Sequence, residues 1–229
     1  MTSRGNSWPP HRRRPRGLHL SRDVPSAPWA AGSRWRAGPD TLVGLWAFGT
    51  GEALLVAAHL GTSPWTVLAV GITRHTPLST GEATLVVSLA VLAAWLPLRE
   101  RPGLGTLANA VVIAVAIDVM GRVLPHPPAL LAQLVMVFVG IALIGVGSGL
   151  YLTAAMGPGP RDGLMTGLHR RFGWPVARIR LGIEAAALLV GWLLGGTVGV
   201  GTVLFAGLVG AAVALALGGG RAATAPVTA

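Results

Sequence analysis

The 229 residues have the composition of a membrane protein, because 52% are hydrophobic and only 11% are charged. The absence of cysteine excludes disulfides, thiolate metal sites and thiol redox chemistry. The net charge of +10 lies mostly in residues 1–38, which hold eight arginines and one aspartate; the rest has ten arginines and seven acidic residues. We therefore expect no nucleic acid as a partner.

Residues 1–38 are predicted to be a disordered, Arg-rich cytoplasmic arm, since proline and serine are scattered among the arginines without a periodic apolar stripe. The apolar core of about 7–15 residues that a signal peptide needs is missing after the basic run. One interpretation is a clamp on anionic lipid, worth about 1 kcal/mol per arginine. The favoured one is a solvated tail, or a start codon placed too early.

Hydropathy predicts six spans after this arm, each near the roughly 20 residues that a bilayer crossing needs. They are residues 41–60, 80–98, 104–121, 130–155, 179–194 and 198–217. Two shorter segments, 64–73 and 160–171, each begin with a proline at what would be the first helical turn, where its missing N–H costs nothing. We expect them to be short broken or re-entrant helices. The alternative is that both cross, which would give four spans per half.

Residues 43–112 are repeated at 139–208 with a constant offset of 96, and 19 of the 70 paired positions are identical. Because each half has three crossings, the second half enters the membrane from the opposite side. The predicted fold class is therefore an all-α polytopic membrane protein built from two inverted three-helix repeats. The predicted units are a first repeat at 39–121, a linker at 122–129, a second repeat at 130–217 and a flexible tail at 218–229.

The distribution of arginines predicts the orientation of these spans. With the N-terminus inside, the outer loops contain only Arg74 and Arg122. The positive-inside rule then favours cytoplasmic N- and C-termini. The arginines on the cytoplasmic side would be Arg99, Arg101, Arg161, Arg170, Arg171, Arg178, Arg180 and Arg221.

The two breaks before the short segments offer a candidate binding site. Ser63 is placed to cap the first short helix, and the second break provides glycines for close backbone approach and an arginine at a helix N-terminus, which suits a carboxylate or phosphate. The alternative is that Arg161 and Asp162 pair with each other or with neighbours, and that the glycines and prolines only shape two tight turns. The candidate substrate-binding residues are Arg161, Asp162, Gly159, Ser63 and Glu52.

Ionisable residues inside predicted spans are candidates for function, because unpaired charges are costly in lipid. Glu52 and His59 are seven residues apart and would share a face of the first span, which leaves a proton relay open. For Glu184 the simpler interpretation is an ion pair with Arg180, four residues earlier. Asp118, close to a span end, is interpreted as structural.

Four motifs carry a resemblance to a known family: Leu60–Trp65, Arg101–Thr106, Gly157–Met165 and Gly195–Thr202. Over about residues 42–217 the chain resembles the YczE branch of the YczE/YyaS/YitT family of bacterial integral membrane proteins. The resemblance implies a multi-pass protein of the bacterial plasma membrane with five or six spans, and it implies no substrate or reaction. Family members usually place an aspartate where this chain has Thr66, so a two-acid cation site at the breaks is not expected.

The motifs of common enzyme classes are not found: there is no His-Glu metal motif, no Gly-x-Ser-x-Gly elbow and no phosphate loop with its lysine. We expect no enzymatic activity, no cofactor and no metal. The leading hypothesis is a permease or exporter of a small anionic solute, with its site between the two breaks in the bilayer. The alternative is an accessory or sensory membrane protein that transports nothing and acts through a protein or lipid partner.

Overall fold

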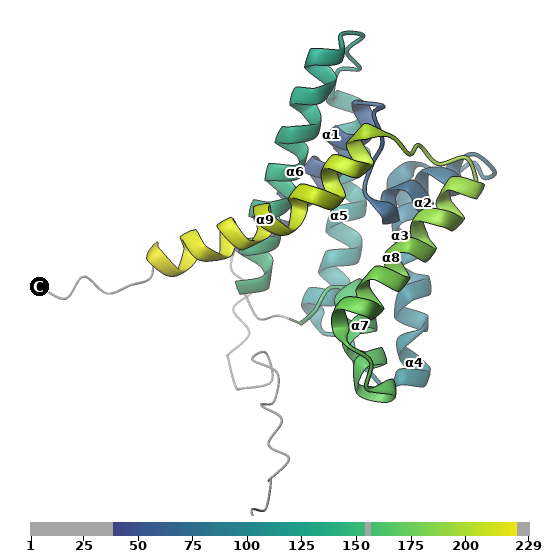
Figure 1. The fold of residues 1–229 in the computed structure, drawn as a ribbon, viewed down its shortest axis with the longest axis vertical. Helices are drawn as coiled ribbons and strands as arrows, with labels where there is room; N and C mark the ends of the chain where they lie inside the picture. Colours follow the sequence, from purple (N-terminus) through teal and green to yellow (C-terminus); the bar gives the residue numbers. More distant parts are fainter. Residues whose placement is uncertain (1–38, 154–156, 224–229) are drawn as a thin grey trace, which may run out of the picture.

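The computed structural model describes residues 39–153 and 157–223, and this part of the chain is all-α, as predicted (Figure 1). The helices are α1 (Pro39–Ala57), α2 (Pro64–Thr73), α3 (Thr80–Ala93), α4 (Trp95–Leu98), α5 (Leu104–Val123), α6 (Leu130–Thr153), α7 (Pro160–Phe172), α8 (Val176–Leu193) and α9 (Val200–Ala223). The predicted basic arm lies outside the described residues, and α9 continues past the predicted repeat end at residue 217.

The helices form two groups that lie side by side (Figure 1). In the first group, α1 packs against α5 and α6, and α6 also packs against α9. In the second group, α2 packs on α3 and α8, and α7 packs on α3 and α8. The first group is held by a core cluster between α1 and α6, consisting of Leu55, Ala58, Val137, Ile141 and Ile144.

Glycines bring α1 and α6 into backbone contact at two points. A Cβ on Gly44 would lie 2.9 Å from the carbonyl oxygen of Gly147, and a Cβ on Gly140 would lie 2.8 Å from the carbonyl oxygen of Gly51. Any larger residue would force these two backbones apart, because real Cβ atoms do not approach so closely. Small residues at a crossing are how helices in lipid gain close van der Waals contact.

Each short helix begins after a glycine in the left-handed region, with φ +105° at Gly61 and +112° at Gly157. Gly61 lies against the start of α9, where a Cβ would be 2.6 Å from the hydroxyl oxygen of Thr202. Gly157 lies against the start of α5, where a Cβ would be 3.2 Å from the hydroxyl oxygen of Thr106. Each break is therefore packed on a helix from the other half of the chain.

Four helical segments are long and apolar enough to cross a membrane: 80–98, 104–123, 130–152 and 200–217. The predicted spans 41–60 and 179–194 are not among them. α1 contains Asp40 and Glu52, and α8 carries Arg178, Arg180 and Glu184, so the mean hydropathy of both helices is lower. The short segments are helices of 10 and 13 residues, too short to cross. The protein is thus a multi-pass membrane protein by its candidate spans.

Candidate functional site

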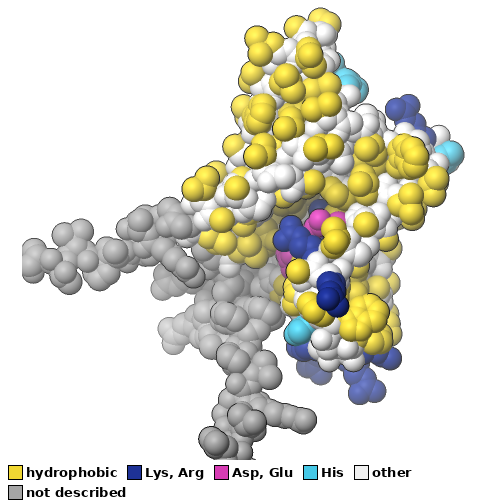
Figure 2. Space-filling view, viewed as in Figure 1, with side chains coloured by type: hydrophobic (Ala, Val, Ile, Leu, Met, Phe, Trp, Pro, Cys, Tyr) yellow, Lys and Arg dark blue, Asp and Glu magenta, His cyan; other side chains and the backbone are white. Residues whose placement is uncertain are grey.

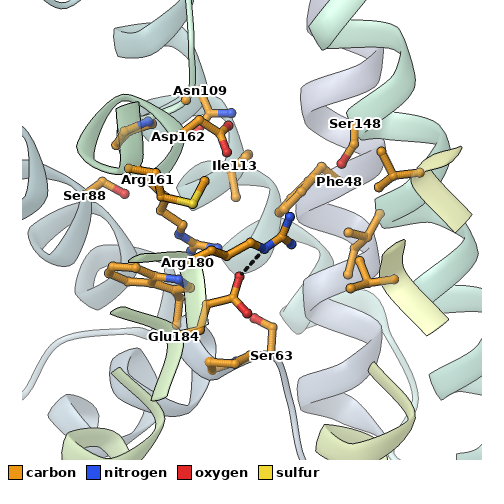
Figure 3. Close-up of a pocket in the computed structure, with 18 of the residues that line it drawn as sticks. Phe48, Ser63, Ser88, Asn109, Ile113, Ser148, Arg161, Asp162, Arg180 and Glu184 are labelled. Carbon is orange, nitrogen blue, oxygen red and sulfur yellow. Dashed lines mark hydrogen bonds and ion pairs between the residues drawn. The ribbon is translucent and has the colours of Figure 1, made fainter. Parts of the chain in front are cut away.

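A cavity of about 170 Å³ lies where the two helix groups meet, and the starts of α2 and α7 both contribute to its wall (Figure 3). Helices from both repeats line it, so it is formed by residues far apart in the sequence. Its polar lining consists of Ser63, Thr84, Ser88, Asn109, Ser148, Tyr151, Arg161, Asp162, Arg180 and Glu184. Its apolar lining includes Phe48, Trp65, Ile113, Ile183, Phe205, Val209 and Val213.

Arg161 lies in the first turn of α7, directly after Pro160, and it lines the cavity. Its guanidinium carbon is 4.9 Å from the ring centroid of Trp65, which occupies the matching position of α2. A cation over an indole face is attracted by the ring quadrupole, but the ring does not neutralise its charge. In residues 39–153 and 157–223, Arg161 forms no ion pair within 4 Å. Of the predicted alternative, the pair between Arg161 and Asp162 is not observed, whereas contacts of both residues with neighbours are.

Asp162 is instead held by Tyr151, whose hydroxyl donates to its Oδ2 at 3.1 Å. Gly159 lies close to the same oxygen, because a Cβ at this position would be 3.2 Å from it. The acid next to Arg161 is therefore hydrogen-bonded by a neutral donor and forms no ion pair with the guanidinium within 4 Å.

Glu52 lies behind this wall, with only 1% of its surface exposed. Its Oε2 accepts hydrogen bonds from the hydroxyls of Ser63 at 2.9 Å and Thr66 at 2.8 Å. Its Oε1 has no hydrogen-bond partner among the described residues. Thr66 thus donates a hydrogen bond to the carboxylate of Glu52. An aspartate at position 66 would instead place a second negative charge beside it.

The structure brings the five predicted site residues together. Gly159, Arg161, Asp162 and Ser63 line the cavity, and Glu52 binds Ser63 from behind. Ser63 also caps α2, as predicted, accepting a hydrogen bond from the Thr66 amide at 3.4 Å. Arg161 lies in the wall of the cavity, as expected of a site residue.

The other ionisable residues have structural partners. Arg180 and Glu184 form the predicted ion pair, with 3.0 Å between Nε and Oε1, at the edge of the cavity (Figure 3). Asp118 of α5 accepts hydrogen bonds from the Ser79 hydroxyl at 2.5 Å and the Gly81 amide at 2.7 Å. It therefore anchors the start of α3, which agrees with a structural role.

The proposed shared face of Glu52 and His59 is wrong. α1 ends at Ala57, and His59 adopts a left-handed backbone with φ +55° beyond the helix. Its side chain is exposed and its ring centroid lies 5.3 Å from that of His126. A proton relay from Glu52 to His59 along one helix face is therefore not formed.

Sequence reasoning missed three aromatic residues at the site. Trp65 lies under Arg161, Tyr151 binds Asp162, and Trp95 donates from Nε1 to the carbonyl oxygen of Pro160 at 2.9 Å. A partial signal existed for Trp65, because the offset of 96 pairs it with Arg161. The single tyrosine and Trp95 gave no such signal, since their contacts depend on how the halves pack.

Comparison with known proteins supports the resemblance found in the sequence. Residues 41–217 match a family of unknown function, DUF6198. An uncharacterized protein of Haemophilus influenzae is 43% identical over 196 residues, covering 84% of this chain and 90% of that protein. No solved structure matches the chain.

Two proteins of Bacillus subtilis are also similar to this chain. The uncharacterized membrane protein YczE is 35% identical over 152 residues, covering 66% of this chain and 71% of YczE. The uncharacterized protein YyaS is 27% identical over 166 residues, covering 71% of this chain and 83% of YyaS. Since the family match spans most of its length, the chain belongs to the DUF6198 family and is related to the membrane protein YczE.

Proposed function

We propose that the protein is a permease or exporter of a small anionic solute and that the solute binds in the cavity between the two helix breaks. The observation that carries this proposal is Arg161, a half-buried guanidinium that lines the cavity and has no carboxylate within 4 Å among the described residues, while Glu52 and Asp162 act on its charge from farther away. A cation at membrane depth is costly unless it is paired. A carboxylate or phosphate of the solute would supply the missing partner.

The short helices add to the preference for an anion. Trp65 and Arg161 each follow the N-terminal proline of their helix, and the contact between them brings the starts of α2 and α7 together. The N-terminus of a helix carries partial positive charge and unpaired N–H groups. Two such ends beside one arginine favour a negative ligand.

Reciprocal contacts support an inverted repeat around this site. Gly44 contacts Gly147, and their counterparts in the other half, Gly140 and Gly51, also contact each other. Residue 140 is 44 plus the offset of 96, and residue 51 is 147 minus the same offset. The same operation converts the contact of Gly61 with Thr202 into that of Gly157 with Thr106. Such exchange is what a pseudo-two-fold axis produces, and in transporters the site lies at the repeat interface near the membrane midplane.

In this arrangement α1 and α8 also cross the bilayer, which gives six crossings. Glu52 is buried among other helices and Arg180 and Glu184 line the cavity, which is the usual arrangement for charged residues at membrane depth, while Asp40 and Arg178 lie near the helix ends. The N- and C-termini lie on the cytoplasmic side of the bacterial plasma membrane, as the arginine distribution favours. The bilayer is then the only partner that the transport function requires.

A flux assay with the full chain in liposomes tests the proposal. The probes are succinate, inorganic phosphate and decyl sulfonate, which keep a negative charge at neutral pH. We expect at least one of them to move faster than through empty vesicles. Arg161→Gln should slow this movement at least about tenfold, because a hydrogen bond to a charged group contributes about 1.5–3 kcal/mol.

The matched control is Arg178→Gln, an exposed arginine of α8 that does not line the cavity. It should leave flux unchanged. If none of the probes moves faster than through empty vesicles, or if Arg161→Gln and Arg178→Gln behave alike, the proposal fails. A stable membrane-protein partner that co-purifies with an inactive chain would favour an accessory role instead.

A further inference from the structure

The two halves differ where the cavity meets the outside of the bundle. α3 packs against α5 in the first half, but the corresponding helices of the second half, α8 and α9, do not pack together in the part of the chain that the structure describes. α9 is correspondingly uncovered: 11% of its span is buried, compared with 39% for α5. The repeat therefore has a gap on one side only.

The cavity extends to this gap, and its two walls have different chemistry. α7 and α8 supply Arg161 and the ion pair of Arg180 and Glu184, whereas α9 supplies Phe205, Val209 and Val213. Figure 2 shows charged side chains gathered in a hollow between α9 and α8, with hydrophobic side chains on both sides. A ligand in this cavity would meet charged side chains on the side of α7 and α8 and apolar side chains on the side of α9.

The outer faces of the two helices that border the gap are also apolar. Leu181 and Leu189 of α8 are 71% and 54% exposed, and Val203 and Leu215 of α9 are 72% and 77% exposed. In a bilayer, side chains of this kind on a spanning helix face acyl chains. The two helices that border the gap therefore expose apolar faces to lipid.

We infer that the transported solute is an amphipathic anion, with one carboxylate, sulfonate or phosphate group at Arg161 and an alkyl chain along α9, and that it enters from the bilayer between α8 and α9. This inference rests on the proposed function and names its substrate class. The cavity of about 170 Å³ is smaller than the roughly 300–1,000 Å³ of a site that encloses a drug-sized ligand. It holds the head group and the first part of the chain, while the rest stays in lipid.

Photochemical labelling of the full chain in liposomes tests this inference. The probe is an alkyl sulfonate with a diazirine on its chain, and the labelled residues are located by mass spectrometry of peptides. We expect labelling of Phe205, Val209 and Val213 that unlabelled decyl sulfonate suppresses and succinate does not. Labels on Val203 and Leu215, which face lipid, should resist this competition and serve as an internal control.

Two comparisons separate a head-group site from simple partitioning into lipid. Arg161→Gln should lower labelling of the cavity face of α9 about tenfold, and Arg178→Gln should not change it. An uncharged alkyl alcohol with the same diazirine should label only the lipid-facing residues of the wild-type protein. This second comparison needs no variant, so it holds even if Arg161→Gln does not fold.

The outcomes distinguish this inference from the function on which it rests. If succinate or phosphate moves in an Arg161-dependent way and cavity labelling is absent, the solute is water-soluble and the inference is overturned. If neither flux nor cavity labelling depends on Arg161, the inference and the proposed function both fail. Equal labelling of cavity and lipid faces by the charged and uncharged probes would also overturn it.

Discussion

Gly163 has no space for a side chain, because a Cβ there would overlap the indole ring of Trp95. Moving that ring aside would cost free energy, because Trp95 is only 2% exposed and is hydrogen-bonded to the carbonyl oxygen of Pro160. We expect Gly163→Ala to destabilise the protein by about 1–3 kcal/mol, the usual effect of overpacking a core. Thermal unfolding of the purified protein in detergent measures this change.

The matched control for Gly163 is Gly182→Ala in α8. Gly182 is also helical, but a Cβ there would meet no atom within 4 Å. Alanine favours helix over glycine by up to about 1 kcal/mol, so the control should raise the midpoint of unfolding or leave it unchanged. Similar losses from both substitutions would contradict a specific role for the contact with Trp95.

At the level of the elements, Asp118 joins α5 to the start of α3. Its two oxygens accept hydrogen bonds from Ser79 and Gly81, and Ser79 also takes part in a capping box with Glu82. Asp118→Ala leaves both donors without this acceptor in a partly buried site. We expect a loss of about 1–3 kcal/mol in the free energy of unfolding, measured by thermal unfolding.

Glu184→Ala provides the comparison for Asp118. It removes an i,i+4 ion pair whose arginine and glutamate side chains are 54% and 36% exposed. Pairs of this kind contribute about 0.3–0.5 kcal/mol, so stability should change little. If Glu184→Ala costs as much as Asp118→Ala, the anchoring role of Asp118 is not supported.

The positions of the helices were predicted better than the contacts between them. Hydropathy and the prolines at 64 and 160 located the helices, because these signals are local in the sequence. Asp118 is 37 residues from Gly81, and nothing local indicates that contact. The same holds for Asp162, which accepts a hydrogen bond from Tyr151 and forms no ion pair with the neighbouring Arg161.

For the whole molecule, the proposed orientation predicts which loops face outward. Because the chain has no cysteine, single cysteines placed at exposed loop positions are unambiguous reporters. His75→Cys and His126→Cys should react with a membrane-impermeant maleimide in intact cells. Pro102→Cys and Trp174→Cys should react only after the membrane is permeabilised.

Several results would contradict this arrangement. If His75→Cys and Trp174→Cys react from the same side, the second half is not inverted relative to the first. The reverse pattern at all four positions would place the N-terminus outside. Reaction of Pro102→Cys in intact cells, with His126→Cys protected, would contradict the arginine-based orientation of the first half.

The repeat in the sequence predicted a symmetrical pair of halves, and the gap between α8 and α9 could not be foreseen from it. Residues 80–93 and 176–189 align without a gap, as do 104–112 and 200–208. α3 nevertheless packs on α5, while α8 stands apart from α9. Whether two amphipathic or apolar helices meet depends on the whole bundle, and helix pattern alone does not determine it.

The glycine crossing of α1 and α6 has a mechanical consequence. Backbones that touch at two separate points along their length cannot rock or slide against each other without breaking one of those contacts. α1 and α6 therefore move as one unit, together with α9, which packs on α6. Any movement of the two helix groups relative to each other then changes the separation of α8 from α9, where the hollow in Figure 2 lies.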